Sequence, residues 1–337
     1  MADVAARAGV SGQTVSRVVN ASPRVDPATR QRVEAAMADL GYRPHRAARA
    51  LRTGRTHTIG LLVSTLATVG NSRMLQAVAD AAAARDFALT VMTLGAAGDA
   101  DVSDAFARLA EQGVDGVVVL NEATAAAREA RIPAGLRVVV VDAPPADLES
   151  VASVDASAPY NTVQTDHAAG ARAAVDHLLD LGHATVCHVA GPADSFAAAQ
   201  RERGWRDALT AHGSAVPGLI RGDWSAASGY TAAAAVVASG ATAVFCANDQ
   251  MALGLLRGVS DAGLDVPRDV SVVGFDDVLD AEQFRPPLTT VRQEFDRLGE
   301  RAVAVLVDAI EQRDAGVRET VPTTLIVRES TAPPAAV

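Results

Sequence analysis

The chain has 337 residues, of which 49% are apolar and 4% aromatic, so it is long enough for one small domain and a larger two-lobed one with an aliphatic core. It has no run of about twenty apolar residues, and its first residues lack the basic-then-apolar pattern of a signal peptide. We therefore expect no membrane span and a cytoplasmic location, and the net charge of −10 taken alone argues against nucleic acid as a partner.

The charge is unevenly distributed along the chain. Residues 1–55 contain ten arginines and four acidic residues, a net charge of +6, which leaves −16 for the remainder. A basic segment on an acidic body is typical of a small polyanion-binding module joined to a larger domain with another task.

Residues 3–41 carry the start and stop signals of three short helices. A side chain that can cap a helix N-terminus precedes each predicted segment; these residues are Asp3, Ser11 and Asp26. Gly9 is expected to end the first helix and Gly41 the third. The short Gly-Val-Ser turn at 9–11 predicts a helix-turn-helix, whose second helix enters the major groove of DNA.

Residues 3–20 closely resemble the DNA-binding head of the lac repressor family; they read Asp-Val-Ala-Ala-Arg-Ala-Gly-Val-Ser-Gly-Gln-Thr-Val-Ser-Arg-Val-Val-Asn. The resemblance implies that Gly12, Gln13 and Arg17 read base edges. Glutamine can form a bidentate contact with adenine and arginine with guanine. Gly12 departs from the tyrosine of the family's type member, so the resemblance implies no operator sequence. The side chains expected to contact phosphates are Thr14, Ser16 and Asn20.

The next segment, 42–55, is basic and is predicted to be helical from about residue 46 to residue 52. Its similarity to the hinge of the family implies a helix that folds on DNA, with Leu51 wedged into the minor groove. The alternative for Leu51 is that it merely packs the linker against the following domain.

From residue 58 onward, strand-like apolar runs alternate with alanine-rich helical stretches. The strand-like runs are 59–63, 88–92, 116–120, 138–141, 186–190, 243–247 and 270–275. The helical stretches include 74–85, 170–181 and 250–262. This alternation predicts an α/β fold with parallel sheets covered by helices on both faces. Because there are too many strands for one compact sheet, we expect two doubly wound lobes with a ligand cleft at the carboxyl ends of the strands.

The predicted organisation has four parts: a helix-turn-helix head at 1–45, a hinge helix at 46–55, an effector-binding core at 56–330 and a tail at 331–337. The expected N-terminal lobe of the core covers about 56–160 and 293–320, and the C-terminal lobe about 161–292 and 321–330. The resemblance to the family, whose core is similar to periplasmic sugar-binding proteins, continues to about residue 328.

Several polar residues stand where a strand-like run ends, which is where the cleft is expected; they are Ser64, Asn121, Asp142, Asn248 and Asp276. Singly, such residues are most often turn formers or helix caps. Together with Arg201, Trp224 and Gln293 they favour a site for a polyhydroxylated ligand, because carboxylates, amides and arginine pair with hydroxyl groups and tryptophan stacks on a sugar ring.

Four strings in the core strengthen the resemblance to the family; they are Gly-Asp-Trp-Ser-Ala-Ala-Ser-Gly (222–229), Ala-Asn-Asp-Gln-Met-Ala-Leu-Gly (247–254), Ser-Val-Val-Gly-Phe-Asp-Asp (271–277) and Pro-Pro-Leu-Thr-Thr-Val-Arg-Gln-Glu-Phe (286–295). By resemblance, the residues at the strand ends and Arg201, Trp224 and Gln293 contact an inducer, and Phe295 packs the cleft. The first string is narrower within the family and favours a galactoside. Residues 68–73, which the resemblance places at the cleft wall, differ from the family's type member in size and charge, so the second part of the ligand is left open.

The residues also bear on other classes of function and on other ligands. The sequence has no histidine cluster, nucleophile elbow or phosphate-binding loop, so we expect no enzyme activity, no catalytic or metal-binding residue and no cofactor. A solute-binding protein without a DNA role does not fit the basic head. A regulator of the same family that answers another glycoside, a nucleoside or a corepressor remains open. Interior roles are expected for Trp205, Cys187 and Cys246, and His183 and His188 are expected to flank strands without a functional role.

The expected assembly is a homodimer on a pseudo-palindromic operator in double-stranded DNA, since a single head makes few base contacts. Dimer contacts are expected from the core. The last residues contain no leucine heptads, so no tetramerising coiled coil is expected. The expected function is that of a sugar-responsive transcriptional repressor released by an inducer; whether the ligand releases or promotes DNA binding is left open.

Overall fold

The computed structural model describes residues 1–19, 22–42, 54–94, 102–120, 130–142, 161–312 and 316–335, and it divides the chain into two compact units, Met1–Thr56 and His57–Val337. Three of the predicted site residues, Asn20, Leu51 and Asn121, lie outside the described residues, as does most of the expected hinge helix. Among the described helices, none combines the length and the apolar character needed to cross a membrane.

The first unit contains the helices α1 (Ala2–Ala8), α2 (Gly12–Val19) and α3 (Pro27–Asp39). Their apolar side chains form one small core, which includes Val4, Val15, Val18, Val33 and Ala36. Ser11 and Asp26 accept hydrogen bonds from the backbone N–H groups of Thr14 and Thr29 at 3.2 and 2.9 Å, as expected of N-caps. The expected cap at Asp3 is wrong: α1 begins one residue earlier, and Asp3 lies in its first turn, where an acidic side chain favours the helix dipole.

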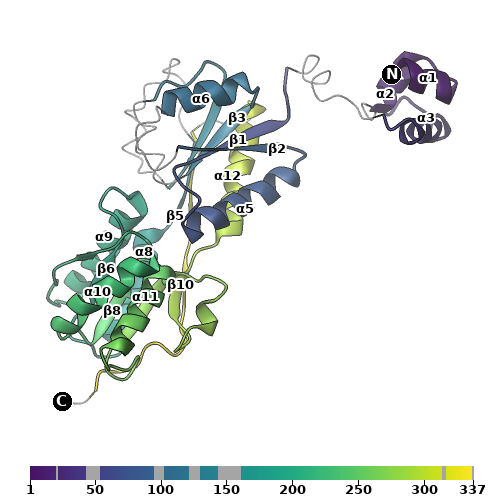
Figure 1. Ribbon diagram of the computed structural model, residues 1–337. Helices are drawn as coiled ribbons and strands as arrows, with labels where there is room; N and C mark the ends of the chain where they lie inside the picture. The colour runs from purple at the N-terminus through teal and green to yellow at the C-terminus, as the bar shows by residue number, and fades with distance from the viewer. Residues whose placement is uncertain are drawn as a thin grey trace. The chain divides into compact units, whose positions relative to one another are not determined.

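The N-terminal lobe of the second unit is built on a parallel sheet with the strand order β11-β5-β4-β3-β1-β2 (Figure 1). The strands are β1 (Thr58–Val63), β2 (Ala88–Thr93), β3 (Gly116–Leu120), β4 (Arg137–Val141), β5 (Asn161–Thr165) and β11 (Arg318–Val321). Helices α5 (Val69–Ala83) and α12 (Phe295–Ile310) share one apolar cluster with the strands, and α6 (Val102–Glu111) shares another. Alternate side chains of β3 and β4 enter the two clusters, so both faces of the sheet are covered.

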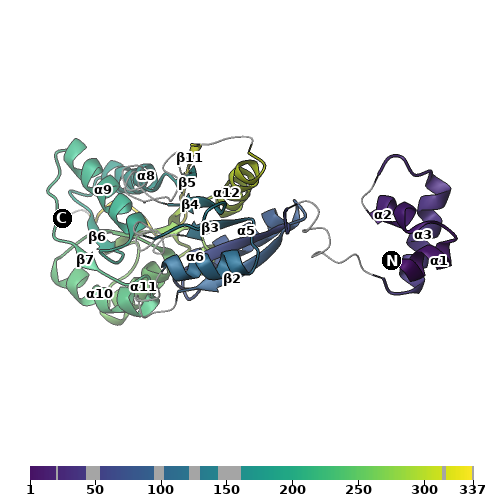
Figure 2. The same cartoon turned by 90° about the horizontal axis from the view of Figure 1, so that it is seen from above.

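The C-terminal lobe repeats this architecture, with the strand order β12-β10-β9-β8-β6-β7. The strands are β6 (Cys187–Ala190), β7 (Ile220–Arg221), β8 (Ala243–Cys246), β9 (Ser271–Asp276), β10 (Thr289–Arg292) and β12 (Thr324–Ile326), and only the β10–β12 pairing is antiparallel in the described part of the chain. Figure 2 shows α8 (His167–Asp180) and α9 (Phe196–Ala211) on one side of this sheet and α10 (Ala226–Ala238) and α11 (Asp249–Asp261) on the other. The predicted α/β class and doubly wound lobes are confirmed.

The chain crosses between the two lobes after β5, after β10 and after β11. The expected lobe boundary near residue 160 is therefore wrong by about five residues, because Asn161–Thr165 pairs with β4 and β11 in the first sheet. Val321, expected in the C-terminal lobe, also belongs to the first sheet. These crossings place Gln293 and the start of α8 between the lobes, beside the carboxyl ends of both sets of strands.

The residues after 330 were expected to form a tail, but those described pack on the C-terminal lobe. The backbone N–H of Ala332 donates to the Ser271 hydroxyl at 3.0 Å, and that hydroxyl donates to the Ala332 carbonyl at 2.9 Å. His177 Nε2 lies 3.0 Å from the hydroxyl of Thr331. The C-terminal segment is thus part of this lobe.

Candidate functional site

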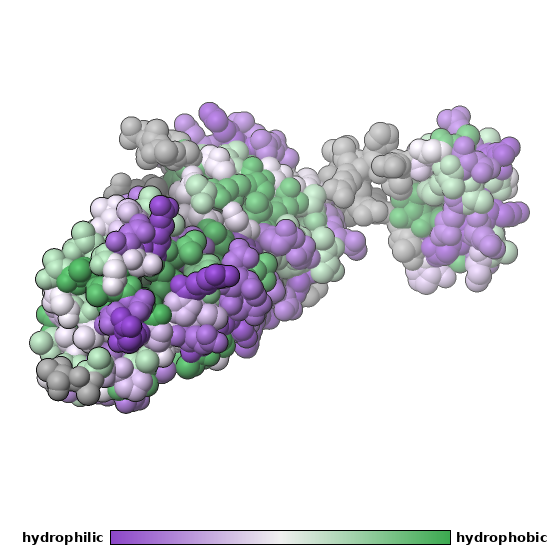
Figure 3. Space-filling model, turned by 60° about the horizontal axis from the view of Figure 1, so that its bottom comes forward, coloured by the Kyte–Doolittle hydropathy of each residue, from purple (hydrophilic) through white to green (hydrophobic). Residues whose placement is uncertain are grey.

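The helix α2 presents a polar face to solvent and an apolar face to the core of the head. Gly12, Gln13 and Arg17 are exposed, whereas Val15 and Val18 are buried. The candidate phosphate contacts Thr14 and Ser16 are half-buried beside them. The helical period separates the two sets, since residues three and four apart share a face. Figure 3 shows hydrophilic side chains over much of the visible face of the head.

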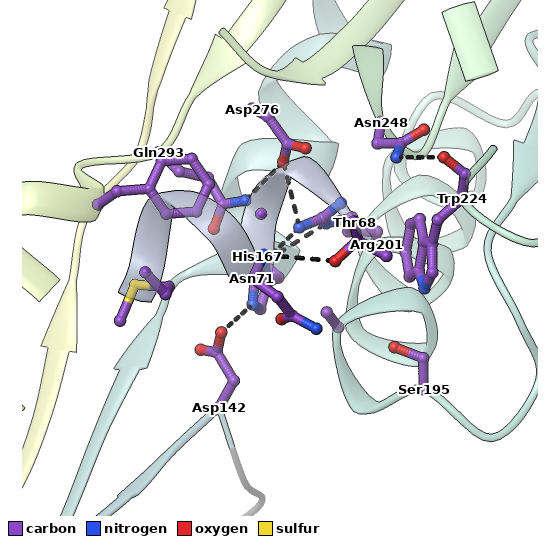
Figure 4. A pocket seen from close by; sticks show the side chains of 14 residues that line it. Thr68, Asn71, Asp142, His167, Ser195, Arg201, Trp224, Asn248, Asp276 and Gln293 are labelled. Atoms are coloured by element: carbon purple, nitrogen blue, oxygen red, sulfur yellow. Dashed lines mark hydrogen bonds and ion pairs between the residues drawn. The ribbon is translucent and has the colours of Figure 1, made fainter. Parts of the chain in front are cut away.

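A second candidate site is a pocket in the core, of about 480 Å³ when its open mouth is included (Figure 4). Residues from both lobes line it; they are Thr68, Gly70, Asn71, Met74, Asp142, His167, Ser195, Ala197, Arg201, Trp224, Asn248, Asp276, Gln293 and Phe295. Those of the N-terminal lobe come from the start of α5, the end of β4 and the start of α12. The others follow strands of the C-terminal lobe or begin its helices.

A chain of polar groups runs through the pocket from one lobe to the other. His167 Nε2 lies 3.2 Å from Asp142 Oδ2, and Arg201 donates from Nε and Nη2 to His167 Nδ1 at 3.4 and 3.3 Å. Arg201 Nη2 also lies 3.7 Å from Asp276 Oδ1, and Gln293 Nε2 donates to the same oxygen at 2.6 Å. A guanidinium has no acceptor, so Nδ1 of His167 must accept. The other ring nitrogen, Nε2, faces Asp142.

Arg201 is 4% exposed and is held on several sides. Its Nη1 donates to the carbonyl oxygen of Ala247, and its guanidinium lies 3.9 Å from the centre of the Phe275 ring. Burial raises the pKa of Asp276, while Arg201 and Gln293 oppose this shift by favouring its ionised form. The arrangement presents a buried, oriented carboxylate and guanidinium to the cavity, which suits recognition of hydroxyl groups.

Trp224 is positioned by its backbone and by a glycine. It has a φ of +73°, and its carbonyl oxygen accepts a hydrogen bond from Asn248 Nδ2 at 3.0 Å. Its ring lies so close to Gly191 that a Cβ there would meet the ring at 2.3 Å. The glycine after β6 thus makes room for the indole at the wall of the pocket.

Of the nine residues predicted to contact an effector, seven line this pocket; they are Asp142, Arg201, Trp224, Asn248, Asp276, Gln293 and Phe295. Ser64 is half-buried directly after β1 and is not among the lining residues. Asn121 lies outside the described residues.

Sequence reasoning placed residues 68–73 at the cleft wall without naming Thr68 or Asn71 as effector contacts, and it missed the lining residues His167 and Ser195. Three of these four residues lie at helix starts that the sequence suggested too late: α5 begins at Val69 and α8 at His167, several residues before the alanine-rich stretches. The capping hydroxyls of Thr68 and Ser195 were an available signal, since each accepts from a backbone N–H three residues on.

The residues expected to have interior roles are buried. Trp205, Cys187 and Cys246 lie in apolar clusters, and both cysteines are free. His183 Nδ1 lies 2.9 Å from the hydroxyl of Thr242, and His188 stacks on Phe245. These contacts account for both histidines without a ligand.

Residues 1–45 match the family described as bacterial regulatory proteins, lacI family, and residues 175–331 match the periplasmic binding protein-like domain. Among curated relatives, the chain is 36% identical to the lactose operon repressor of Escherichia coli strain K12, over 98% of this chain and 90% of that protein. It is 36% identical to the HTH-type transcriptional regulator CelR of Thermobifida fusca, over 97% and 96% of the two chains, and 33% identical to the ribose operon repressor of Escherichia coli strain K12, over 93% of each.

Solved structures agree with these matches. A lac repressor dimer bound to operator and the anti-inducer ONPF superposes with a TM-score of 0.82 at 33% identity, over 98% of both chains. A CelR–cellobiose complex superposes with a TM-score of 0.70 at 34% identity, over 97% of this chain and 98% of that one. With its helix-turn-helix head and its two-lobed core, the chain belongs to the lacI family of bacterial regulatory proteins and is a DNA-binding transcriptional repressor with a sugar-binding type of core.

Proposed function

We propose that this repressor binds a pseudo-palindromic operator as a homodimer and is released from it by a galactoside bound between the lobes of the core. The observation that carries the ligand class is the meeting of Arg201, Asp276 and Trp224 on one cavity. The first two offer charged hydrogen-bonding groups to vicinal hydroxyls, and the indole offers an apolar face to a pyranose ring.

The choice of a galactoside rests on the Gly-Asp-Trp-Ser string around Trp224 and on the similarity to the lactose operon repressor. A different glycoside is the second candidate. The start of α5 supports it, because Thr68 and Asn71 make this wall of the pocket polar, and because CelR, equally similar in sequence, has a structure with cellobiose.

The DNA contacts proposed are those of the exposed face of α2. Gln13 and Arg17 read bases, Gly12 permits close approach of the backbone, and Thr14 and Ser16 contact phosphates. Asn20 at a phosphate and Leu51 in the minor groove complete the proposed interface. Apolar side chains on the core, such as Leu253 on α11 at 43% exposed, are candidates for the dimer contact; the dimer in the lac repressor–operator structure supports this assembly.

The proposed switch depends on the two lobes. A sugar that bridges Asp142 of the N-terminal lobe and Asp276 of the C-terminal lobe changes how the lobes meet, because each side chain belongs to a different sheet. A change of that kind in both protomers alters the spacing of the two heads. Coupling between two such sites typically amounts to about 1–3 kcal/mol, which corresponds to a loss of operator affinity of roughly fivefold to 150-fold.

Tryptophan fluorescence tests the ligand class. Trp224 lies at the pocket, whereas Trp205 is fully buried in the lobe and serves as an internal reference. We expect lactose to quench the emission of the wild-type protein saturably, and Trp224→Phe to lose this response. Parallel titrations with cellobiose, ribose and a nucleoside give the specificity.

The outcomes separate the candidates. Quenching by lactose, followed by release of a labelled operator fragment at the same concentrations, supports galactoside induction. A response to cellobiose alone supports the second candidate. Tighter operator binding in the presence of the responding sugar contradicts release as the direction of the switch.

A further inference from the structure

Asp249 is a fully buried carboxylate at the edge of the pocket, and it does not line the cavity. It is the first residue of α11, directly after Asn248, which caps the helix by accepting from the backbone N–H of Met251. Asn248 lines the pocket, and Asp249 is buried between α11 and the ends of β9 and β10. Of these two consecutive residues, Asn248 therefore lines the cavity, and Asp249 makes contacts inside the lobe next to it.

The carboxylate of Asp249 joins three segments of the C-terminal lobe. Its Oδ2 accepts from the backbone N–H of Val278 at 2.9 Å, in the loop after β9, and its Oδ1 accepts from the hydroxyl of Thr290 on β10 at 2.6 Å. It packs on Gly274 of β9, where a Cβ would lie 2.2 Å from Oδ1. Both oxygens are therefore occupied by donors from different elements.

The segment that Asp249 anchors has an unfavourable backbone. Asp276 and Asp277 have φ values of +118° and +53°, a region that side chains other than glycine rarely adopt. Such residues persist only where the surroundings hold them. The carboxylate of Asp277 accepts from Arg292 and Arg328 at 2.7 and 2.6 Å, which holds the loop from the side of β10. Asp249 holds it from the side of α11.

This anchoring bears directly on the pocket, because Asp276 points its carboxylate at Arg201 and Gln293 from within the segment. We propose that Asp249 is a positioning residue for effector binding: it ties the start of α11 to the loop after β9 and so holds Asp276 and Asn248 in register across the cavity. The inference rests on the proposed function of the pocket as an effector site.

Asparagine is the conservative replacement at this position. Burial raises the pKa of Asp249 well above its usual value, and the neighbouring Asp276 adds to the shift, so the environment favours an uncharged side chain. In Asp249→Asn the amide oxygen accepts from Val278, and the amide nitrogen donates to the Thr290 hydroxyl, which can act as an acceptor. Asp249→Asn can therefore keep both hydrogen bonds, to Val278 and Thr290, while it removes the ionisable carboxyl group.

The test compares lactose affinity with stability in the full-length protein. We expect Asp249→Ala to raise the Kd for lactose by at least about tenfold, and Asp249→Asn to keep it within about threefold of wild type. Ser330→Ala is the matched control: Ser330 is fully buried, accepts from the N–H of Thr289 at 2.8 Å and donates to the carbonyl of Val272, but away from the pocket.

A structural role alone predicts that Asp249→Ala and Ser330→Ala lower the melting temperature and leave the Kd of the folded protein unchanged; this result overturns the proposal. If Asp249→Ala does not fold, Asp249→Asn is compared with Thr290→Val instead. The proposal is then overturned if Asp249→Asn raises the Kd for lactose as strongly as Thr290→Val does. If wild-type protein binds neither lactose nor cellobiose, the ligand assignment fails separately. In that case, crystal structures of the wild type and the variants test the proposal. A displacement of Asp276 from Gln293 only in Asp249→Ala or Thr290→Val supports it, and an unchanged position of Asp276 in these variants contradicts it.

Discussion

His188 is a fully buried imidazole in the middle of β6. Its Nδ1 lies 2.9 Å from the carbonyl oxygen of Phe245, so Nδ1 carries the proton, and the ring stacks on Phe245 with the centroids 4.7 Å apart. Its Nε2 is buried without a hydrogen-bond partner in the described part of the chain. Burial lowers the pKa of His188 from 6.5 to about 4, because the apolar surroundings disfavour the charged ring.

The consequence is a loss of stability in acid. The unfolded chain binds a proton at this histidine below pH 6.5, whereas the folded protein does so only near pH 4. The free energy of unfolding therefore decreases as the pH falls through this window, by about 3 kcal/mol from this group. His177 and His183, whose pKa values are also lowered chiefly by burial, add in the same direction.

Urea unfolding followed by circular dichroism between pH 7.5 and pH 4.5 measures this effect. In His188→Phe, which keeps an aromatic ring against Phe245, we expect a clearly flatter dependence on pH. Equal slopes for the variant and the wild type would show that His188 does not control the acid sensitivity of the lobe.

At the scale of elements, the C-terminal segment after β12 is hydrogen-bonded to the starts of β9 and β10. Arg328 donates to the carbonyl of Leu288 at 2.7 Å and to Asp277 at 2.6 Å. Ser330 is fully buried and joins β9 to β10, and the backbone of Ala332 exchanges hydrogen bonds with Ser271. The segment follows β12, so it holds together strands that lie some forty residues or more earlier in the chain.

Removal of residues 329–337 is expected to destabilise the core. The deletion removes hydrogen-bond partners of buried groups of Val272, Thr289 and Ser271, and each loss costs about 1 kcal/mol or more. We expect the free energy of unfolding to fall by roughly 3–5 kcal/mol, against about 1–2 kcal/mol for Ser330→Ala. Calorimetry of the three proteins checks the order, and a deletion no worse than Ser330→Ala would contradict it.

Over the whole molecule, the charges of the two units are opposite. The first 55 residues carry a net charge of +6, whereas the whole chain carries −10. A basic head attracts the phosphate backbone at long range, and the acidic core does not compete with it. In the proposed interface, sequence discrimination depends on the few exposed side chains of α2, among which Arg17 is the charged one.

Arg17→Ala is expected to lower affinity for the specific operator by about 1–3 kcal/mol and to change nonspecific DNA binding much less. Fluorescence anisotropy at several salt concentrations separates the two, because affinity that depends on phosphate contacts falls with salt. Arg7→Ala on α1, which removes an exposed ion pair with Asp39, is the matched control. An equal loss on specific and nonspecific DNA would assign Arg17 to the backbone.

Whether a strand or helix could be predicted from the sequence depended on the character of its own side chains. The core strands β1, β3, β8 and β9 are buried apolar runs, which periodicity identifies directly. β5 reads Asn-Thr-Val-Gln-Thr and is stabilised by partners on both sides, so its own side chains do not reveal it. The start of α5 contains valine, glycine and asparagine, weak helix formers whose helical state depends on the cap at Thr68 and on packing.

The sequence by itself determined the helix-turn-helix head, the alternation of strands and helices, and the polar residues that end the strands, because each depends on neighbours in the chain. It also indicated seven of the residues that line the pocket. Only the tertiary structure decided which distant side chains meet: Asp142 of the N-terminal lobe lies beside His167 of the C-terminal lobe, and Gln293 after β10 lies beside Asp276 at the end of β9. The physical reason is that a pocket between lobes is made by residues far apart in sequence, whose approach depends on where the chain crosses from one sheet to the other.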